Sequence, residues 1–406
     1  MSGGLLSVEE ALATLLAGAR PITEVETVPT LAANGRVLAR TQASTLDVPP
    51  LDNTSMDGYA VRAEDCKSGS ARLRVAQRIP AGAIGEPLAR GTAARIFTGA
   101  PIPAGADAVV MQEQCEVVGE DVVVKHVPHA GEWIRRAGED IRAGATVLEA
   151  GVRLRAQEIG LAASVGLPTL PVTRRCRVAL FSTGNELVMP GELLPPGAIY
   201  NSNRYTLTGL LRMLGCEVED LGIVPDKLDA TRAALAKAAR NNDLILTSGG
   251  VSVGEEDHVT AAVTAEGRLD LWKIALKPGR PLAYGAVRRA DGSDASFLGL
   301  PGNPVSSFVT FLLFARPFVL RRQGVVQVAP HTFAARADFE WPRPDPRREF
   351  LRVKLNPTGG LDLFPNQSSG VLTSTVWGDG LVDNPPKQVI RRGDTVRFLA
   401  FSELLH

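Results

Sequence analysis

The sequence predicts a multidomain protein of the α/β plus β class, and three observations support this prediction. The chain has 406 residues, more than one core can hold, because single cores stop growing near roughly 250 to 300 residues. Strands alternate with helices between residues 177 and 322, which is typical of a parallel sheet covered by helices on both faces. Short β-rich runs separated by glycine and proline fill residues 41–150 and 325–406, which indicates mostly-β domains.

We therefore expect four domains. Residues 1–44 and 141–175 form a small helical linker domain, and residues 45–140 form a β-rich domain inserted into it. Residues 176–324 form the central α/β domain. Residues 325–406, where the runs are short and prolines are frequent, form a C-terminal β-barrel domain.

Local patterns predict the elements of the first two domains. Ser7 and Glu10 form a capping box before an amphipathic helix with Val8, Leu12, Leu15 and Leu16 on one face. A second helix is expected at 155–167, ending at Gly166, and we expect it to pack beside the first helix across the inserted domain. The clearest strands of the inserted domain are 93–97, 108–111 and 122–124.

The α/β domain is predicted in the same way. Expected strands cover 178–182, 217–224, 244–247 and 271–276, and a further strand leads to Leu300. Four helices are expected in this domain. One carries Leu207, Leu210, Leu211 and Leu214 on one face, one covers 229–240, one begins after Asp257, and one begins at Pro304.

Composition excludes several classes of function. Lysine plus arginine and aspartate plus glutamate both number 44, so no net charge attracts nucleic acid or anionic lipid. Cys66, Cys115, Cys176 and Cys216 are far apart in sequence and indicate reduced thiols. The first ten residues lack the features of a signal peptide, and no run of ~20 apolar residues is present, so we expect a cytoplasmic protein.

The loops that follow the expected α/β strands are rich in polar and glycine residues. Ligands of open α/β sheets bind beyond the carboxyl ends of the strands, so these loops are expected to form one site. The loop 248–254 would let its backbone approach a phosphate closely through Ser248, Gly249, Gly250, Ser252 and Gly254. The alternative is a plain tight turn.

Three acids, Glu186, Asp226 and Asp257, each come just after an expected strand. Carboxylates together with phosphate oxygens and water are ligands that suit Mg²⁺, and Asp226 and Asp257 are the expected metal ligands. Singly, each acid could instead be a helix N-cap, and Asp226 before Thr231 is an easy candidate.

Two further loops carry groups that suit an oxyanion. Lys277 and Arg280 flank a Pro-Gly turn that would aim both cations into the same crevice. The segment Pro301, Gly302, Asn303 and Pro304 precedes a helix bearing Ser306 and offers another anion site. The alternatives are two solvated surface charges and an ordinary helix start.

One motif favours a different enzyme class. Residues 250–254 fit the G-x-S-x-G elbow of serine hydrolases. Such an elbow needs an acid and then a histidine later in the chain, and only His258, His331 and His406 follow it. His258 is too close in sequence and His406 is terminal, so this class is the weaker hypothesis.

The motifs at 183–186, 248–255, 277–281 and 300–304 together resemble the molybdopterin molybdenumtransferases, including the C-terminal part of gephyrin. The segments 52–60, 95–101 and 138–141 resemble the second-domain motifs of that family. The resemblance therefore covers essentially the whole chain in order. It implies a four-domain, elongated homodimer in which the second domain of one subunit approaches the third domain of the other.

The resemblance also implies residue roles and a reaction. Asp57, Thr98 and Asp140 would complete the site from the second domain, while Glu186, Asp226 and Asp257 serve nucleotide, metal and catalysis. Oxyanion contacts are implied for Lys277, Arg280, Ser306, Arg347 and Ser369, and pterin-nucleotide contacts for the Thr183-Gly184 loop. The implied reaction inserts molybdate into the dithiolene of adenylyl-molybdopterin, with Mg²⁺-dependent hydrolysis and AMP release. An adenylyltransferase that supplies this substrate is the implied partner.

Three positions depart from the family pattern. Asn185 stands where many members carry Asp, Arg280 where they carry Lys, and His258 where an aromatic residue is usual. The second changes oxyanion geometry, because an arginine presents a fork where a lysine presents a point charge. A second hypothesis is a non-catalytic pterin- or nucleotide-binding scaffold module of the same fold, against which the intact acids and Lys277 argue.

Overall fold

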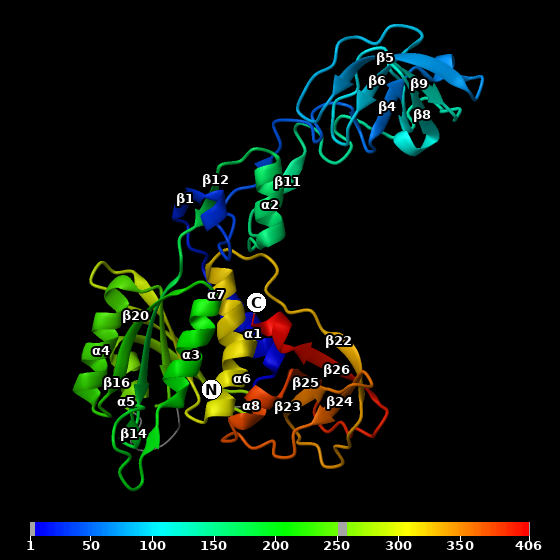
Figure 1. Ribbon diagram of the computed structural model, residues 1–406. Coiled ribbons are helices and arrows are strands. Elements are labelled where there is room, and N and C mark those ends of the chain that lie inside the picture. Colours follow the sequence, from blue (N-terminus) through cyan, green and yellow to red (C-terminus); the bar gives the residue numbers. More distant parts are fainter. Residues whose placement is uncertain (1–4, 251–257, 406) are drawn as a thin grey trace.

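The computed structural model describes residues 5–250 and 258–405, and its outline is elongated (Figure 1). A β-rich body lies at one end, a small body containing α2, β1, β11 and β12 lies in the middle, and the remaining elements form the largest body at the other end. The chain passes through the middle body twice, once on the way to the inserted β domain and once on the way back.

The first helix, α1 (Val8–Gly18), begins with the predicted capping box. The Glu10 amide donates to Ser7 Oγ at 3.1 Å, and the Ser7 amide donates to Glu10 Oε2 at 2.8 Å. Val8, Ala11 and Leu15 are buried in the core of the α/β body, where α1 contacts α7 (Arg316–Arg322).

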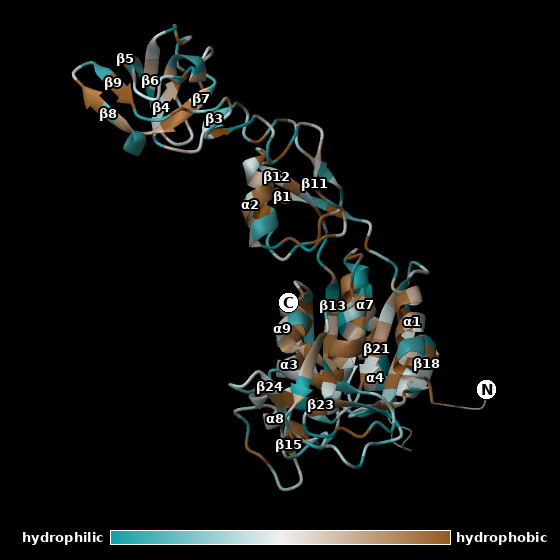
Figure 2. Cartoon of the chain, turned by 90° about the vertical axis from the view of Figure 1, so that its right-hand side faces the viewer, coloured by the Kyte–Doolittle hydropathy of each residue, from teal (hydrophilic) through white to brown (hydrophobic). Residues whose placement is uncertain are grey.

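The middle body consists of short elements around α2 (Ala156–Ser164) and the core residues Leu38, Leu154, Ala162 and Leu170. The helix α2 contacts β11 and the 3-10 turn η1. The prediction that this helix packs beside α1 is therefore wrong, because the buried face of α1 is occupied by the α/β core. The other elements of this body are β1 (Val25–Pro29) paired with β12 (Thr169–Thr173), η1 (Thr30–Ala32), and β2 (Gln42–Ala43) paired with β11 (Thr146–Leu148). The pair β3 (Asn53–Thr54) and β10 (Ile134–Arg135) lies at the inserted domain, next to β7 (Figure 2).

The inserted domain is a six-stranded sheet in the order β7-β4-β6-β5-β9-β8. Its predicted strands are confirmed, since 93–97, 108–111 and 122–124 correspond to β6, β7 and β9 within one residue at each end. The elements are β4 (Gly58–Val61), η2 (Ala63–Cys66), β5 (Ala71–Ile79), β6 (Thr92–Ile96), β7 (Ala108–Met111), η3 (Gln112–Gln114), β8 (Cys115–Val118) and β9 (Asp121–Val124).

The α/β sheet has the order β16-β13-β17-β21-β20-β18. The first four strands are parallel, as predicted, but β20 runs antiparallel to both β21 and β18. The strands of this sheet are β13 (Arg177–Thr183), β16 (Glu217–Val224), β17 (Leu244–Ser248), β18 (Gly267–Lys273), β20 (Pro281–Arg288) and β21 (Asp294–Leu300). The short strands β14 (Leu187–Val188) and β15 (Ile199–Tyr200) form a separate parallel pair.

Successive side chains of β13 point alternately into the two cores on either face of this sheet. Val178 and Leu180 face the core that contains α3, α1 and α7, whereas Ala179 and Phe181 face the core that contains α4 and α5. Both faces are therefore apolar, and the ribbon around β21 is brown in Figure 2. The helices are α3 (Ser202–Met213), α4 (Leu228–Asn241) and α5 (His258–Glu266).

One long helical segment, Pro304–Arg322, runs through the centre of this body. It consists of α6 (Pro304–Thr310), a π-helical turn η4 (Phe311–Ala315) and α7. Pro317, which has no amide hydrogen, lies just after the π turn. Among the described residues this segment alone has the length and hydropathy of a membrane span, but 83% of its most apolar window is buried inside the protein.

The C-terminal domain is a barrel in which β23 pairs with both β24 and β25. A short strand from the α/β region, β19, extends this sheet by pairing with β23. The prediction of one strand over 271–276 is therefore wrong, because the chain leaves β18 and joins the other sheet. The elements are β19 (Leu276–Lys277), β22 (Phe333–Ala337), β23 (Arg348–Leu355), β24 (Gly360–Leu363), α8 (Thr373–Trp377), β25 (Gly380–Asn384), β26 (Thr395–Ala400) and α9 (Phe401–Leu404).

Candidate active site

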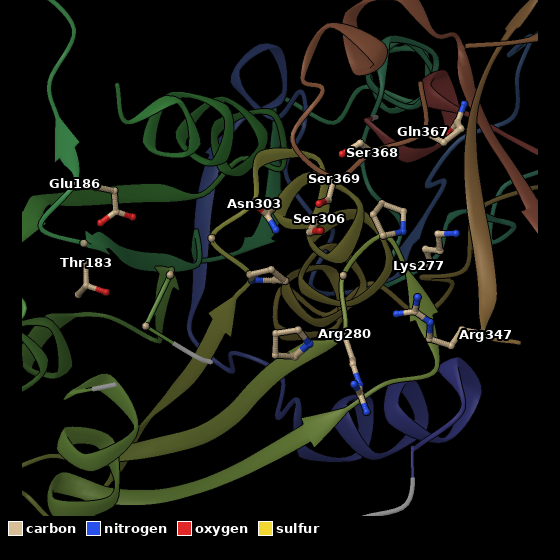
Figure 3. Close-up of a pocket in the computed structure, with 18 of the residues that line it drawn as sticks. Thr183, Glu186, Lys277, Arg280, Asn303, Ser306, Arg347, Gln367, Ser368 and Ser369 are labelled. Atoms are coloured by element: carbon tan, nitrogen blue, oxygen red, sulfur yellow. The ribbon is translucent and has the colours of Figure 1, made fainter. Parts of the chain in front are cut away.

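A cavity of about 710 Å³ lies between the carboxyl ends of the α/β strands and the barrel, and we call it the active-site cavity. Figure 3 shows Thr183 and Glu186 on one side, and Lys277 and Arg347 on the other. Most of the predicted site residues line it: Thr183, Gly184, Glu186, Asp226, Gly249, Gly250, Lys277, Arg280, Pro301, Gly302, Asn303, Ser306, Arg347 and Ser369. Five lining residues were not among the predicted ones: Pro278, Gly279, Pro281, Gln367 and Ser368.

The glycine-rich loop after β17 requires glycine at its two described positions. Gly249 and Gly250 have φ angles of +87° and +65°. A Cβ on Gly249 would lie 2.9 Å from the Thr183 carbonyl oxygen, and one on Gly250 would lie 2.4 Å from a Val259 methyl carbon. The amide of Gly249 donates to the Leu300 carbonyl at 3.1 Å, so this amide is already used within the protein rather than presented to a phosphate.

Asn203 on α3 connects this loop to the loop after β21. Its Nδ2 donates to Ser248 Oγ at 2.7 Å and to the Gly302 carbonyl at 2.7 Å. Ser248 and Pro304 line a smaller adjoining cavity of about 350 Å³ instead of the main one. The two cavities share Thr183 and Glu186, so the predicted loops converge.

The acids Glu186 and Asp226 lie on the cavity wall, after β13 and β16 respectively. The N-cap alternative is wrong for Asp226, because the N-cap of α4 is Lys227. It is also wrong for Glu186, which precedes the strand β14. Asp257, Ser252 and Gly254, together with most of the G-x-S-x-G motif, lie outside the described residues.

The cations at the barrel side of the cavity are held by carboxylates that the sequence analysis missed. Lys277 Nζ lies 3.2 Å from Glu349 Oε1 and 3.4 Å from Asp345 Oδ2. Arg347 donates to both oxygens of Asp345, at 2.8 and 2.9 Å. These hydrogen bonds keep the pKa of Asp345 well below its usual range. The acids therefore orient the two cations at the cavity wall.

Arg280 differs from these two cations. Its side chain is exposed on the cavity wall. Within residues 5–250 and 258–405, no carboxylate forms an ion pair with its guanidinium. Its fork of donors is thus available to a ligand.

The loop carrying Ser368 and Ser369 is held by Arg352, whose side chain is 1% exposed. Arg352 Nη2 donates to the Ser368 carbonyl at 3.2 Å, and its amide donates to Gln367 Oε1 at 2.9 Å. The Ser369 carbonyl accepts from the Val305 amide at 2.9 Å. The barrel and α6 together therefore place this loop at the cavity.

The predicted residues of the inserted domain do not line this cavity. Asp57 and Thr98 form a pair, in which the Thr98 amide and Oγ1 both donate to Asp57 Oδ1 at 2.7 Å. The Thr98 amide is the main reason why the pKa of Asp57 is lowered. Asp140 is exposed beside the β-bridge between Val48 and Ile141.

This pair predicts a specific titration. We expect Thr98→Val, which removes the hydroxyl donor but keeps the amide, to raise the pKa of Asp57 part of the way toward its usual value. Carboxyl-carbon NMR titration of wild type and variant measures this difference. Identical titration curves would contradict it. Because the Asp57 carboxylate is fully exposed, we expect no measurable change in stability.

Comparisons with known proteins agree across the chain. The family description "MoeA N-terminal region (domain I and II)" matches residues 6–166, "Probable molybdopterin binding domain" matches 179–321, and "MoeA C-terminal region (domain IV)" matches 334–401. A molybdopterin molybdenumtransferase from Haemophilus influenzae is 37% identical, over 99% of this chain and 100% of its own. One from a Nostoc species is 39% identical, over 89% and 85%.

The chain belongs to the molybdopterin molybdenumtransferase family. The family assignment makes it an enzyme of molybdenum cofactor biosynthesis. A crystal structure of a molybdopterin biosynthesis MoeA protein from Pyrococcus horikoshii has a TM-score of 0.85 at 30% identity, covering 98% of this chain and 100% of that one. The multidomain fold expected from the sequence is thus confirmed for this transferase, and none of these relatives supports the serine hydrolase alternative.

Proposed function

We propose that this enzyme inserts molybdate into the dithiolene of adenylyl-molybdopterin, with Mg²⁺-dependent hydrolysis that releases AMP. One observation carries the proposal: acids on the sheet side and cations on the barrel side face each other across a single cavity. A substrate that joins a nucleotide to a pterin and meets an oxyanion needs both kinds of group.

The acids are proposed to serve the pyrophosphate end of the substrate. Asp226 and Asp257 would hold Mg²⁺, which polarises the bond between AMP and the pterin. Carboxylate oxygens suit this hard cation. Mg²⁺ commonly keeps phosphate and water oxygens among its ligands. Glu186 lines the same wall, and the Thr183-Gly184 turn and glycine loop would place the nucleotide.

The cations are proposed to bind molybdate, which is a substrate of the reaction. Arg280 offers a free fork of donors to the oxyanion, and Lys277 adds charge from a position fixed by Glu349. Ser306, Arg347 and Ser369 would complete the oxyanion contacts from α6 and the barrel. No side chain is required as a nucleophile.

The assembly is proposed to be a cytoplasmic homodimer with a shared site. Asp57, Thr98 and Asp140 lie on the inserted domain, which is at the far end of the molecule from the active-site cavity (Figure 1). A second subunit could bring them to that cavity. The domain limits 1–44 with 141–175, 45–140, 176–324 and 325–406 belong to the same proposal, as does an adenylyltransferase that delivers the substrate.

The test is AMP release and metal loading of the dithiolene from adenylyl-molybdopterin, with Mg²⁺ and molybdate. We expect Asp226→Asn to lower the rate by at least about 100-fold, because it removes a ligand of the metal. Asp229→Asn is the matched control, since Asp229 is exposed in the first turn of α4 and does not line the cavity.

The scaffold alternative gives a different result in this assay. A binding module would retain the nucleotide without turnover in wild type. Equal rates in Asp226→Asn and Asp229→Asn would contradict the assigned role of Asp226 while leaving the reaction itself in place.

A further inference from the structure

A second large cavity, of about 860 Å³, lies where the middle body meets the α/β body and the C-terminal helix. We call it the junction cavity. Its wall comes from residues 149–155, Arg175 before β13, the end of α3, residues 325–331 and Glu403 on α9. It shares no lining residue with the active-site cavity.

The wall of the junction cavity is strongly cationic. Five arginines line it, against two glutamates: Arg153, Arg155, Arg175, Arg212, Arg316, Glu149 and Glu403. The whole chain has equal numbers of acidic and basic residues, so this is a local concentration of charge. His331 also lies on the wall.

The inner arginines are held in place mainly by backbone carbonyls. Arg153 donates to the carbonyl of Met213 at 2.5 Å, Arg175 to that of Gly215 at 2.9 Å, and Arg316 to those of Val328 and Glu403 at 3.1 and 3.0 Å. These carbonyl oxygens orient the guanidinium groups but do not neutralise the charges of Arg153 and Arg175.

Carboxylate neutralisation is incomplete at this cavity. Across the part of the chain that the structure describes, Arg153, Arg175 and Arg212 have no carboxylate oxygen within 4.0 Å, whereas Arg155 is paired with Glu158. Burial lowers the pKa of Arg316 to about 10, the neighbouring charge of Arg153 adds to this shift, and the charge of Glu403 opposes it. Arg153, Arg175 and Arg212 place like charges on one wall of the cavity, and a bound anion would offset their repulsion.

We infer that the junction cavity binds a phosphate-bearing small molecule, whose phosphate is held by the forks of Arg175 and Arg212 beside Arg153. An arginine guanidinium can donate two parallel hydrogen bonds to two oxygens of one phosphate. The cavity volume is in the range of sites for small organic ligands and exceeds the need of a single oxyanion. The ligand would touch both the middle body and the α/β body, and so would restrain their relative orientation.

The test uses full-length protein with two probes, inorganic pyrophosphate and ADP, in calorimetric titrations. Arg212 is the residue to change, because it is exposed and no ion pair would be lost. We expect Arg212→Gln to weaken binding at this site by about tenfold, the loss of one charge-assisted hydrogen bond. Arg240→Gln, which removes an exposed arginine in the last turn of α4, should leave binding unchanged.

Hydrogen exchange locates the site independently of the catalytic reaction. Protection of residues 149–155 and 325–331 by either probe supports the inference, and stronger binding of ADP than of pyrophosphate would identify a nucleotide as the source of the phosphate. Protection confined to 277–281 and 301–303, or equal affinities of Arg212→Gln and Arg240→Gln, would overturn it. Neither the titration nor the hydrogen-exchange measurement depends on AMP release by the enzyme.

Discussion

Replacement of Arg280 by glutamine is expected to lower kcat/KM for molybdate insertion by about 100-fold and to leave thermal stability unchanged. The reason is the contrast between the cations of the active-site cavity. Lys277 forms ion pairs with Asp345 and Glu349, and Arg347 forms one with Asp345. The guanidinium of Arg280 forms no ion pair with a carboxylate of the described residues. Removing a preorganised donor to a developing or bound anion costs about 2.7 to 4 kcal/mol. Steady-state kinetics against molybdate concentration measures the effect.

The variant Arg280→Lys tests the geometry of this contact. It keeps the charge but replaces the fork with a single ammonium, so an intermediate rate is expected. A rate for Arg280→Gln equal to that of wild type would show that the oxyanion is bound elsewhere. A large drop in the unfolding temperature would show instead that Arg280 has a structural role.

Replacement of Glu349 by alanine is expected to lower the free energy of unfolding by about 3 kcal/mol. The Glu349 carboxylate is 1% exposed and accepts hydrogen bonds from Trp341 Nε1 at 2.7 Å and Asn384 Nδ2 at 3.4 Å, besides its contact with Lys277. Each buried donor left without an acceptor costs about 1 to 3 kcal/mol. The lost ion pair with Lys277 contributes less to the loss of stability, because the Lys277 side chain is 38% exposed and retains its ion pair with Asp345.

Urea denaturation of the full chain, followed by tryptophan fluorescence, measures this loss. The matched control is Glu340→Ala, which removes an exposed acid from the same domain and should change stability by less than about 0.5 kcal/mol. Glu349→Gln should recover much of the stability, because the amide oxygen still accepts a hydrogen bond. Equal losses in the alanine variants of Glu349 and Glu340 would contradict the buried-network interpretation.

The sequence by itself determined most elements of this protein and most of the site. Strong periodicity identified α1, α3, α4, β13 and β17, because each buries a regular apolar face. Loops at the carboxyl ends of parallel strands must meet at one edge of the sheet. The convergence of Thr183, Glu186, Asp226 and the glycine loop therefore follows from the order of strands and loops along the chain. The Pro-Gly turn after an expected strand added Lys277 and Arg280, and the family resemblance added Arg347 and Ser369.

Tertiary structure alone decided the parts that depend on contacts between distant segments. The chain leaves β18 at Lys273 and pairs with the barrel at β19, a change of sheet that has no local signature. The same contact places Glu349 and Asp345 beside Lys277 across about 70 residues of sequence. Likewise, α1 was predicted correctly as a helix, but the partner predicted for it, the helix at 155–167, was wrong. An amphipathic face specifies burial and does not specify which surface covers it.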